Sequence, residues 1–253
     1  LKEQFPDANL GIWGVWDSYV FKYLNQRLAA QPAGKPIFVF VLTSTNHPPY
    51  DLPQDYQRVP RDMAQWKGET TSDTLLLNLD SYHYAADLLG GFVQDVQKGP
   101  LKANTIVAAT GDHNVRSFGM YAQDHRRFLM RQVPFVIWGE GLACGPQQAL
   151  PASHRDMFAT LLPLVGVAGP YINTGRNLLN TPQGTPLDAP RAMFFTGEAR
   201  NTQGLWQLGN KESFVCSAEQ PSTDCQFNAL DDQQERARYG LLDWNVRISL
   251  NRK

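Results

Sequence analysis

The sequence predicts an α/β fold with a mostly parallel central sheet and a small antiparallel region near the C-terminus. Two short apolar runs, 37–43 and 105–110, are rich in β-branched and aromatic residues, as is typical of strands covered on both faces. A long stretch with helical periodicity separates them. The order strand, helix, strand indicates a parallel α/β unit.

Helices are predicted from apolar periodicity and from the residues at their starts. The segment 17–30 begins with Asp17 as a cap, and 153–164 begins with Ser153 as a cap and has Asp156 in its first turn. In 72–98, apolar residues recur every three or four positions. These residues form one predicted stripe: Leu76, Leu79, Tyr82, Ala86, Leu89, Val93 and Val96.

The remaining elements divide the chain into two parts. The run 133–138 is a third predicted strand of the central sheet. After Gly169 the sequence becomes rich in Pro and Gly, so we expect domains at 1–183 and 184–253, the second a small α+β subdomain. Short antiparallel strands are expected in it at 192–195, 205–208 and 214–217, followed by a closing helix or strand at 239–250 that packs Leu241, Leu242 and Trp244.

Composition excludes several classes of function. The chain has 253 residues, 42% of them hydrophobic, which is enough for one substantial core. Its formal net charge is -1, so it has no basic field with which to bind nucleic acid. Its longest apolar runs are far shorter than the roughly 20 residues of a membrane helix.

Three cysteines are present, at positions 144, 216 and 225. Cys216 and Cys225 flank a polar loop that could close as a disulfide in an oxidising compartment. The alternative is a pair of thiols, and the spacing does not decide between the two.

Polar side chains with ligand chemistry follow two of the predicted strands. The strand that ends at Thr110 continues into Gly-Asp-His-Asn, which places Asp112 and His113 at the carboxyl edge of the sheet. A carboxylate and an imidazole are good ligands for a divalent cation. The alternative is that Asp112 caps a turn and His113 is an ordinary loop residue.

Other candidate residues lie in neighbouring loops. His47 follows the strand 37–43 and could donate a hydrogen bond to a phosphoryl or sulfuryl oxygen or act as a general acid, unless it is simply an exposed loop histidine. His125 is either a further metal ligand, an anion-binding group with its neighbouring arginines, or solvated surface charge. The aromatic stretch 13–17 either lines a cleft or packs the helix entry, and we expect the second.

The set of candidates is incomplete for catalysis. A catalytic metal usually has three or more protein ligands, and covalent catalysis needs an activated Ser, Thr or Cys. Only one adjacent ligand pair is found, and no Ser or Thr lies in a motif typical of a nucleophile. The residues by themselves therefore give only part of an active site.

Together these segments resemble the lipoteichoic acid synthase-like phosphoglycerol transferases of the sulfatase/alkaline phosphatase superfamily. The resemblance extends over about 13–179 and rests on order and spacing. The segments are Thr-Ser-Thr-Asn-His-Pro-Pro-Tyr at 43–50, Ser-Asp-Thr-Leu-Leu-Leu-Asn-Leu-Asp at 72–80, Asn-Thr-Ile-Val-Ala-Ala-Thr-Gly-Asp-His at 104–113, Val-Pro-Phe-Val-Ile-Trp-Gly at 133–139 and His-Arg-Asp-Met-Phe-Ala-Thr-Leu-Leu-Pro at 154–163.

The resemblance implies an alkaline phosphatase-like fold and roles for particular residues. It implies that Asp112 and His113 ligate a divalent cation, with Mn²⁺ expected first and Zn²⁺, Mg²⁺ or Ca²⁺ as alternatives. It implies that His47 binds the phosphate or glycerol head of a substrate. His125 resembles an additional histidine ligand of phosphoethanolamine transferases, whereas Asn114 departs from many relatives in the loop after the ligand pair.

The family's threonine nucleophile and first acidic ligand lie upstream of the matching segments. The sequence also begins Leu-Lys-Glu-Gln-Phe without an initiator Met, so we expect a C-terminal part of the enzyme that is inactive alone. Residues 1–183 would be the end of the sulfatase-like catalytic domain. The upstream half of the same enzyme is then an expected partner.

The implied reaction is transfer of phosphoglycerol from a phospholipid head group to a cell-envelope glycan or glycolipid. Relatives are anchored by N-terminal membrane helices, which implies an extracytoplasmic site, periplasmic or extracellular. Hydrolysis of a sulfate or phosphate ester and transfer of phosphoethanolamine are alternatives. A non-catalytic envelope-binding module is an alternative of another class.

Overall fold

The computed structural model describes residues 1–62, 73–115, 132–142, 152–169, 175–179, 191–194, 198–201, 204–207, 212–215 and 229–251. The chain divides into two compact units. The first comprises Leu1–Gly111, Val115–Met120 and Pro134–Leu142, and the second comprises Asp112–Asn114, Tyr121–Val133 and Ala143–Lys253. The expected domain boundary at 183/184 lies outside the described residues and stays a prediction.

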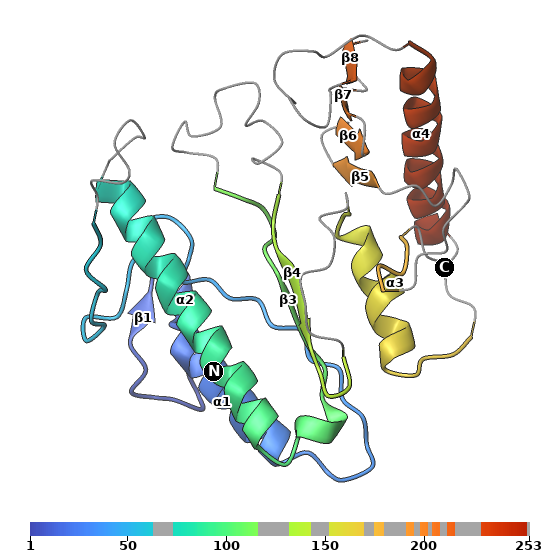
Figure 1. Ribbon diagram of the computed structural model, residues 1–253. Helices are drawn as coiled ribbons and strands as arrows, with labels where there is room; N and C mark the ends of the chain where they lie inside the picture. The colour runs from blue at the N-terminus through green and yellow to red at the C-terminus, as the bar shows by residue number, and fades with distance from the viewer. Residues whose placement is uncertain are drawn as a thin grey trace. The chain divides into compact units, whose positions relative to one another are not determined.

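Two long helices form the framework of the first unit (Figure 1). They are α1, Asp17–Ala29, and α2, Asp73–Lys98, and both agree with the helices predicted from periodicity. Phe21 meets Phe92 with ring centroids 5.6 Å apart, and further along both helices Asn25 Nδ2 donates to Asp95 Oδ2 at 3.1 Å. The order of these contacts shows that α1 and α2 run in the same direction.

The core of the first unit lies between these helices. Its buried side chains are Phe21, Leu24, Phe92 and Val96, and partly buried side chains pack around them. Burying each such side chain stabilises the folded state by about 1.5–3 kcal/mol. The surrounding residues are Leu28, Val41, Leu88, Leu89, Leu101 and Val107.

The predicted apolar stripe of α2 holds only in the second half of the helix. Val93 and Val96 are buried as expected, but Tyr82 is 56% exposed. In the first half the buried face includes Asn78 and Ser81, whose polar atoms bond to the loop that carries His47. A buried polar group needs hydrogen-bond partners. The first half of α2 can therefore bury Asn78 and Ser81 only because the loop that carries His47 supplies those partners.

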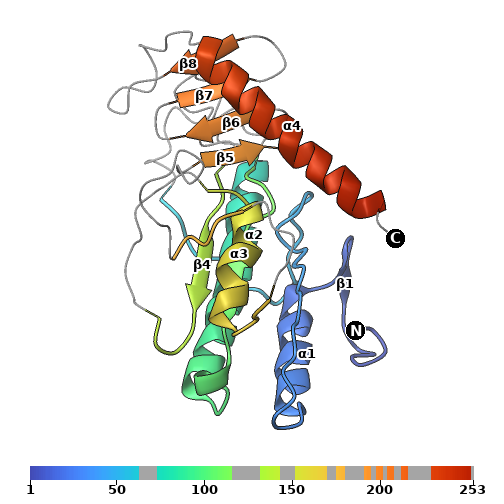
Figure 2. The same cartoon turned by 90° about the vertical axis from the view of Figure 1, so that its right-hand side faces the viewer.

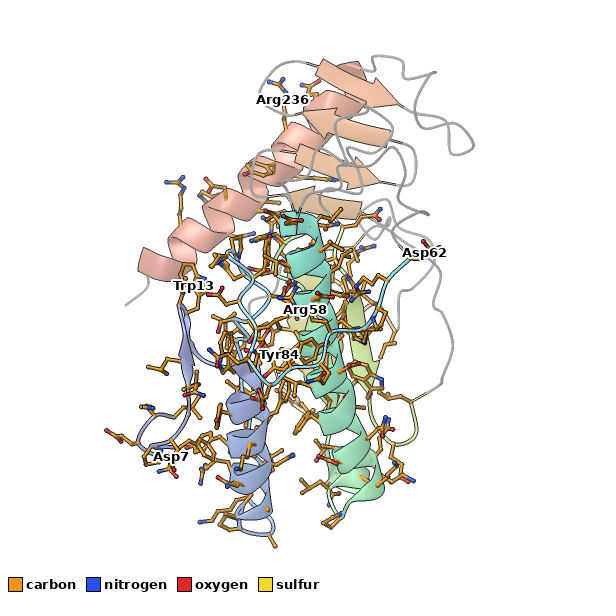
Figure 3. All side chains as sticks on the ribbon, turned by 90° about the vertical axis from the view of Figure 1, so that its left-hand side faces the viewer. Asp7, Trp13, Arg58, Asp62, Tyr84 and Arg236 are labelled. Atoms are coloured by element: carbon orange, nitrogen blue, oxygen red, sulfur yellow. The ribbon has the colours of Figure 1, made fainter. Side chains whose placement is uncertain are left out.

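Arginines tie the segment before α2 to the helix (Figure 3). The Asp80 side chain is 8% exposed and lies 3.5 Å from Arg58 Nη1, and its Oδ1 accepts from Arg61 Nε at 3.2 Å. Arg61 Nη2 also donates to the Leu79 carbonyl at 3.1 Å. This buried carboxylate therefore has both a charge partner and directed hydrogen bonds, as burial requires.

The central pair of strands is antiparallel, contrary to the predicted parallel sheet. The strand β3, Val107–Thr110, and the strand β4, Phe135–Trp138, lie where strands were predicted, and a short 3₁₀ helix, η2, Lys102–Asn104, leads from α2 toward β3. Val107 pairs with Trp138 and Thr110 pairs with Phe135. Parallel pairing was inferred for 37–43 and β3 across α2, and that pairing is not found among the described residues.

The segment 37–43 forms neither a strand nor a helix. Val41 packs on the core, whereas Phe40 and Leu42 are 77% and 72% exposed. The prediction of a strand covered on both faces is therefore wrong for this chain. The alternation fits one packed face, but without a hydrogen-bonded neighbour in the described structure the segment forms no ladder.

Helix α3, Arg155–Leu164, belongs to the second unit. Its N-cap is His154, and Ser153, the predicted cap, contributes its backbone N–H, which donates to Asp156 Oδ2 at 2.8 Å. Asp156 Oδ1 accepts from Arg176 N at 2.8 Å. The Asp156 carboxylate thus closes the start of α3 and ties the segment 175–179 to it.

A four-stranded antiparallel sheet and a long helix complete the second unit (Figure 2). The sheet confirms the antiparallel region, with β6 added to the predicted strands; its strands are β5, Arg191–Phe194, β6, Glu198–Asn201, β7, Gly204–Gln207, and β8, Glu212–Val215. The helix α4, Ala229–Asn251, confirms the helical alternative of the predicted closing element at 239–250 and begins ten residues earlier. Leu241 and Trp244, predicted to pack, are 57% and 55% exposed.

No helix in the described ranges combines the length and apolar character needed to span a bilayer.

Phe92 and Tyr82 provide a matched test of the core. Phe92 is 6% exposed and Tyr82 is 56% exposed on the same helix. Phe92→Ala should lower the free energy of unfolding by about 3–5 kcal/mol, because it leaves a cavity against Phe21. Tyr82→Ala should change it by less than about 1 kcal/mol. Urea denaturation checks this, and equal losses would place the core elsewhere.

Tyr84 should make stability depend on alkaline pH. Its side chain points from α2 toward the start of α1 (Figure 3), where burial raises the pKa of its phenol and the nearby Ser18 partly opposes the rise. The neutral phenol is favoured in the folded state, so its contribution is full below pH ~10 and is lost as pH rises through the folded pKa. Tyr84→Phe should therefore make the alkaline fall in unfolding free energy shallower. The exposed control Tyr82→Phe should leave it unchanged.

Candidate functional site

His47 lies in a loop, residues 44–51, that a buried carboxylate joins to α1; we call it the His47 loop. Asp17 is 0% exposed, and its Oδ1 accepts from Ser44 N at 2.9 Å while its Oδ2 accepts from Thr45 N at 3.2 Å. Asp17 N in turn donates to Thr45 Oγ1 at 3.2 Å. Both carboxylate oxygens are satisfied by backbone donors, which fixes the start of the loop.

Asp17 was predicted to cap its own helix, and this prediction is wrong. The N-cap is Trp16, which makes no side-chain capping bond, and Asp17 is the first residue inside α1. The helix dipole favours a negative charge at this end. The carboxylate keeps that favourable position while its oxygens bond to the loop instead of to helical amides.

The middle and end of the His47 loop are held by α2. Asn46 Oδ1 accepts from Asn78 Nδ2 at 3.2 Å and from Ser81 Oγ at 2.8 Å. Tyr50 closes the loop by donating its backbone N–H to the His47 carbonyl at 2.8 Å. Its ring is buried against Leu75, which offsets the cost of its left-handed backbone at φ 65°.

The His47 ring is held at one nitrogen. Nδ1 lies 3.1 Å from the Pro48 carbonyl oxygen, and Trp13 Nε1 donates to that same oxygen at 2.7 Å. The Trp13 and His47 rings meet edge to face with centroids 4.2 Å apart. Because a carbonyl can only accept, Nδ1 carries the proton of the neutral ring, and Nε2 is left to accept a hydrogen bond, or to donate one when protonated.

The aromatic residues before α1 divide between two roles. The prediction that this stretch packs the helix entry fits Trp16, since a Cβ added at Gly11 would lie 2.8 Å from the Trp16 ring. It is wrong for Trp13, which is 57% exposed and contacts the His47 loop. Figure 3 shows Trp13 at the opposite end of the N-terminal segment from Asp7.

A pocket of about 240 Å³, including its part open to solvent, lies beside His47. One wall is residues 11–16, which contain the turn of a small hairpin formed by β1, Leu10–Gly11, and β2, Gly14–Val15. The other wall is the His47 loop, and its lining residues are Ser44, Thr45, His47, Pro49 and Asp51.

The predicted ligand pair lies directly after β3. His113 N donates to Asp112 Oδ1 at 2.8 Å, and His113 Nε2 lies 3.6 Å from Asp112 Oδ2. His113 Nδ1 lies 3.0 Å from the Asn114 carbonyl oxygen. As in His47, the carbonyl oxygen can only accept, so His113 Nδ1 carries the proton of the neutral ring. His113 Nε2 is then left beside the Asp112 carboxylate, where it could bind a metal.

This arrangement fits one side of a cation site. Two atoms bound to one cation at roughly 2.0–2.2 Å lie about 3–3.5 Å apart. The observed separation of 3.6 Å therefore needs little adjustment. No group of three or more His, Cys, Asp or Glu side chains suited to a metal occurs within the described residues, so the pair is a partial ligand set there.

The two predicted sites belong to different units and each is described within its own. His47 lies in the first unit, whereas Asp112 and His113 lie in the second. His125, Cys144, Cys216 and Cys225 lie outside the described residues.

Sequence reasoning missed the residues that hold His47. The sequence marks Asp17 as a polar residue at the start of a helix, but its hydrogen-bond partners, Ser44 and Thr45, are 27 and 28 positions away. Asn46 next to His47 was part of a recognised motif, yet nothing local indicates Ser81 as its donor, 35 positions away. Only the packing of α1 and α2 reveals these pairs.

Comparisons with known proteins agree on a family and a fold. The model of the family Sulfatase matches residues 2–167. Lipoteichoic acid synthase 1 of Bacillus subtilis (strain 168) is 25% identical over 185 residues, which are 69% of this chain and 28% of that protein.

Two solved structures extend the likeness to the fold. A protein in the alkaline phosphatase superfamily from Vibrio parahaemolyticus matches with a TM-score of 0.67 and 22% identity, over 96% of this chain and 56% of that one. The lipoteichoic acid synthase LtaP from Listeria monocytogenes matches with a TM-score of 0.74 and 15% identity, over 96% of this chain and 61% of that one. The fold is thus alkaline phosphatase-like. The chain spans less than two thirds of each of these relatives.

Asp17→Asn should release the start of the His47 loop. The substitution replaces one acceptor oxygen with an NH₂ group that faces a backbone N–H. It should lower the free energy of unfolding by about 1.5–3 kcal/mol and remove the hydrogen-exchange protection of the Ser44 and Thr45 amides. Asp7→Asn, at an exposed carboxylate, is the control. Retained protection at both amides would disprove the role of Asp17.

Proposed function

The chain belongs to the sulfatase family, and from that premise we propose that it is part of a metal-dependent phosphoglycerol transferase acting on a cell-envelope glycan or glycolipid. The observation that carries the proposal is the 25% identity with lipoteichoic acid synthase 1 across 69% of the chain. The likeness in fold to the lipoteichoic acid synthase LtaP supports it.

Members of this superfamily typically depend on metal, and Asp112 and His113 are the proposed ligands here. A carboxylate with an imidazole suits Mn²⁺, and also Zn²⁺, Mg²⁺ or Ca²⁺ to differing degrees. When bound, the cation would neutralise charge on a phosphoryl group. His125 is proposed as an additional ligand. The fixed tautomer of His113 supports the assignment, because its Nδ1 lies 3.0 Å from the Asn114 carbonyl oxygen and its Nε2 lies beside Asp112.

His47 is the proposed substrate-binding residue. The contact of its Nδ1 with the Pro48 carbonyl leaves Nε2 for the head group of the substrate. A protonated ring would donate to a phosphoryl oxygen, and a neutral ring would accept from a glycerol hydroxyl. The bonds of Asp17 and Asn46 support this role, since a preorganised loop loses little entropy when it binds.

The nucleophile is proposed to be a threonine outside this chain, and no residue of this chain is proposed to react covalently. In such a transfer the threonine Oγ attacks phosphorus and displaces the lipid alcohol, which takes a proton. An acceptor hydroxyl then attacks the phosphoenzyme and restores the threonine. The chain spans 28% of the length of the curated relative, so the upstream half is a proposed partner.

The location and organisation follow from the same proposal. The site would lie outside the cytoplasm, periplasmic or extracellular, with a membrane anchor in the upstream part. Residues 1–183 would complete the catalytic domain, and 184–253 would form an accessory subdomain. The proposed substrates are a phospholipid head group and an envelope glycan.

One rival function is supported by the family match itself. The matched family is named Sulfatase, so the same residues would serve hydrolysis of a sulfate or phosphate ester or transfer of phosphoethanolamine. A non-catalytic envelope-binding module is the rival of another class. Product analysis separates the reactions, and the metal measurement below separates an enzyme from the binding module.

Mn²⁺ affinity tests the proposed ligand pair. The chain should bind Mn²⁺ tightly only when the upstream segment is added, because a pair of ligands is a partial site. Asp112→Ala should weaken that binding by at least about 10–100-fold, whereas Asp7→Ala should not. Calorimetry and elemental analysis measure both. Absence of metal under either condition would favour the binding module.

A further inference from the structure

We propose that the pocket beside His47 is a carbohydrate subsite, in which a neutral sugar ring lies on the indole of Trp13 and bonds its hydroxyls to Asp51. The inference deepens the proposed function, since this sugar would be part of the acceptor glycan. No such role follows from the motifs that identify the family, because Trp13 and Asp51 lie outside them.

Trp13 is an exposed aromatic side chain held in one position. It is 57% exposed, yet its Nε1 donates to the Pro48 carbonyl at 2.7 Å and its ring meets His47 at a centroid distance of 4.2 Å. Because the N–H is already bonded, the indole offers a ligand its π surface. The C–H groups on one face of a sugar ring are suited to pack on such a surface.

The polar groups of the pocket suit hydroxyls. In the His47 loop, the lining side chains with polar atoms are those of Ser44, Thr45, His47 and Asp51. Thr45 Oγ1 accepts from the Asp17 amide, and His47 is assigned to the head group. Asp51 and Ser44 are therefore left for the hydroxyls of a sugar. A carboxylate only accepts hydrogen bonds and offers several positions for them. Hydroxyl groups are the donors that it would need.

The charge of the pocket favours a neutral ligand over an anion. Asp51 is the one lining residue with a formal charge, and neither lysine nor arginine lines the pocket formed by these described residues. An anionic group there would face a carboxylate with no cation to offset it. A phosphate is therefore disfavoured beside Asp51.

The same polar groups disfavour an acyl chain. A hydrocarbon in the pocket would cover Asp51 and His47 without bonding to them, and unpaired polar groups oppose burial. The pocket is open, because its volume of about 240 Å³ includes space in contact with solvent, so a ligand would lie against the Trp13 ring rather than be enclosed. A sugar ring, with one C–H face and several hydroxyls, has the polarity that such an open surface requires.

Both walls of the pocket are preorganised. In the hairpin, Leu10 pairs with Val15 and Gly11 pairs with Gly14, and the Trp16 ring packs on Gly11. On the other side, Asp17 and Asn46 fix the His47 loop. A rigid site loses less conformational entropy when a ligand binds, so a small ligand that makes few contacts can still be bound.

Titration of the ¹⁵N-labelled chain with neutral methyl glycosides tests the proposal. Methyl glucoside, methyl galactoside and the methyl glycoside of N-acetylglucosamine serve as probes, and at least one should shift the Trp13 indole N–H signal with saturation in the millimolar range. Trp13→Ala should weaken that binding at least tenfold, and Asp51→Asn should weaken it several-fold. Trp13→Phe keeps an aromatic face and should lose less than Trp13→Ala.

The control variant is Trp244→Ala, at a tryptophan that is 55% exposed on α4 in the other unit, and it should bind the glycoside as the unchanged chain does. Absence of a shift with every glycoside would overturn the proposal. So would equal affinity in Trp13→Ala, or saturable binding of inorganic phosphate or of phosphatidylglycerol vesicles at Trp13 in place of the glycosides.

Failure of the proposed function gives a different result. If Asp112 is not a metal ligand, Mn²⁺ binding fails while glycoside binding at Trp13 persists. If the subsite is wrong, the glycosides fail to bind while the Asp112-dependent Mn²⁺ affinity persists.

Discussion

The carboxylate of Asp17 joins the first turn of α1 to the loop that carries His47, and much of the first unit depends on this junction. A fully buried carboxylate is costly unless its oxygens are bonded, and here two backbone amides of the loop bond to them. The loop and the helix therefore stabilise each other. Loss of either partner would leave polar atoms buried without bonds, so the position of His47 is linked to the stability of the unit.

Preorganisation of His47 has a chemical consequence. The Pro48 carbonyl lies within hydrogen-bond distance of His47 Nδ1 and accepts from Trp13 Nε1, which directs the remaining nitrogen of the imidazole toward a ligand. The same carbonyl holds the indole beside the ring. One backbone oxygen therefore orients both the group proposed to bind the head group and the surface proposed to bind a sugar. His113 shows the same device in the second unit, where the Asn114 carbonyl lies 3.0 Å from its Nδ1.

The sheet expected at the centre of the fold is represented by β3 and β4 in the described residues. Their antiparallel register and the exposed Phe40 and Leu42 differ from the parallel sheet covered on both faces that was expected. Strands covered on both faces need neighbours on each side and a second layer. In the described residues the segment 37–43 has no such neighbours, and of Phe40, Val41 and Leu42 only Val41 packs on the core.

The sequence by itself determined the elements whose signal is local. Periodicity located α1 and α2, apolar runs located β3 and β4, and the motifs around His47 and after Thr110 identified the family that the comparisons then confirmed. Tertiary structure alone decided that Asp17 bonds to Ser44 and Thr45, that Trp13 contacts His47, and that β3 pairs in the antiparallel sense. The physical reason is that propensity and periodicity depend on neighbouring residues, whereas hydrogen-bond partners and strand pairing depend on groups that only the packing of distant segments brings together.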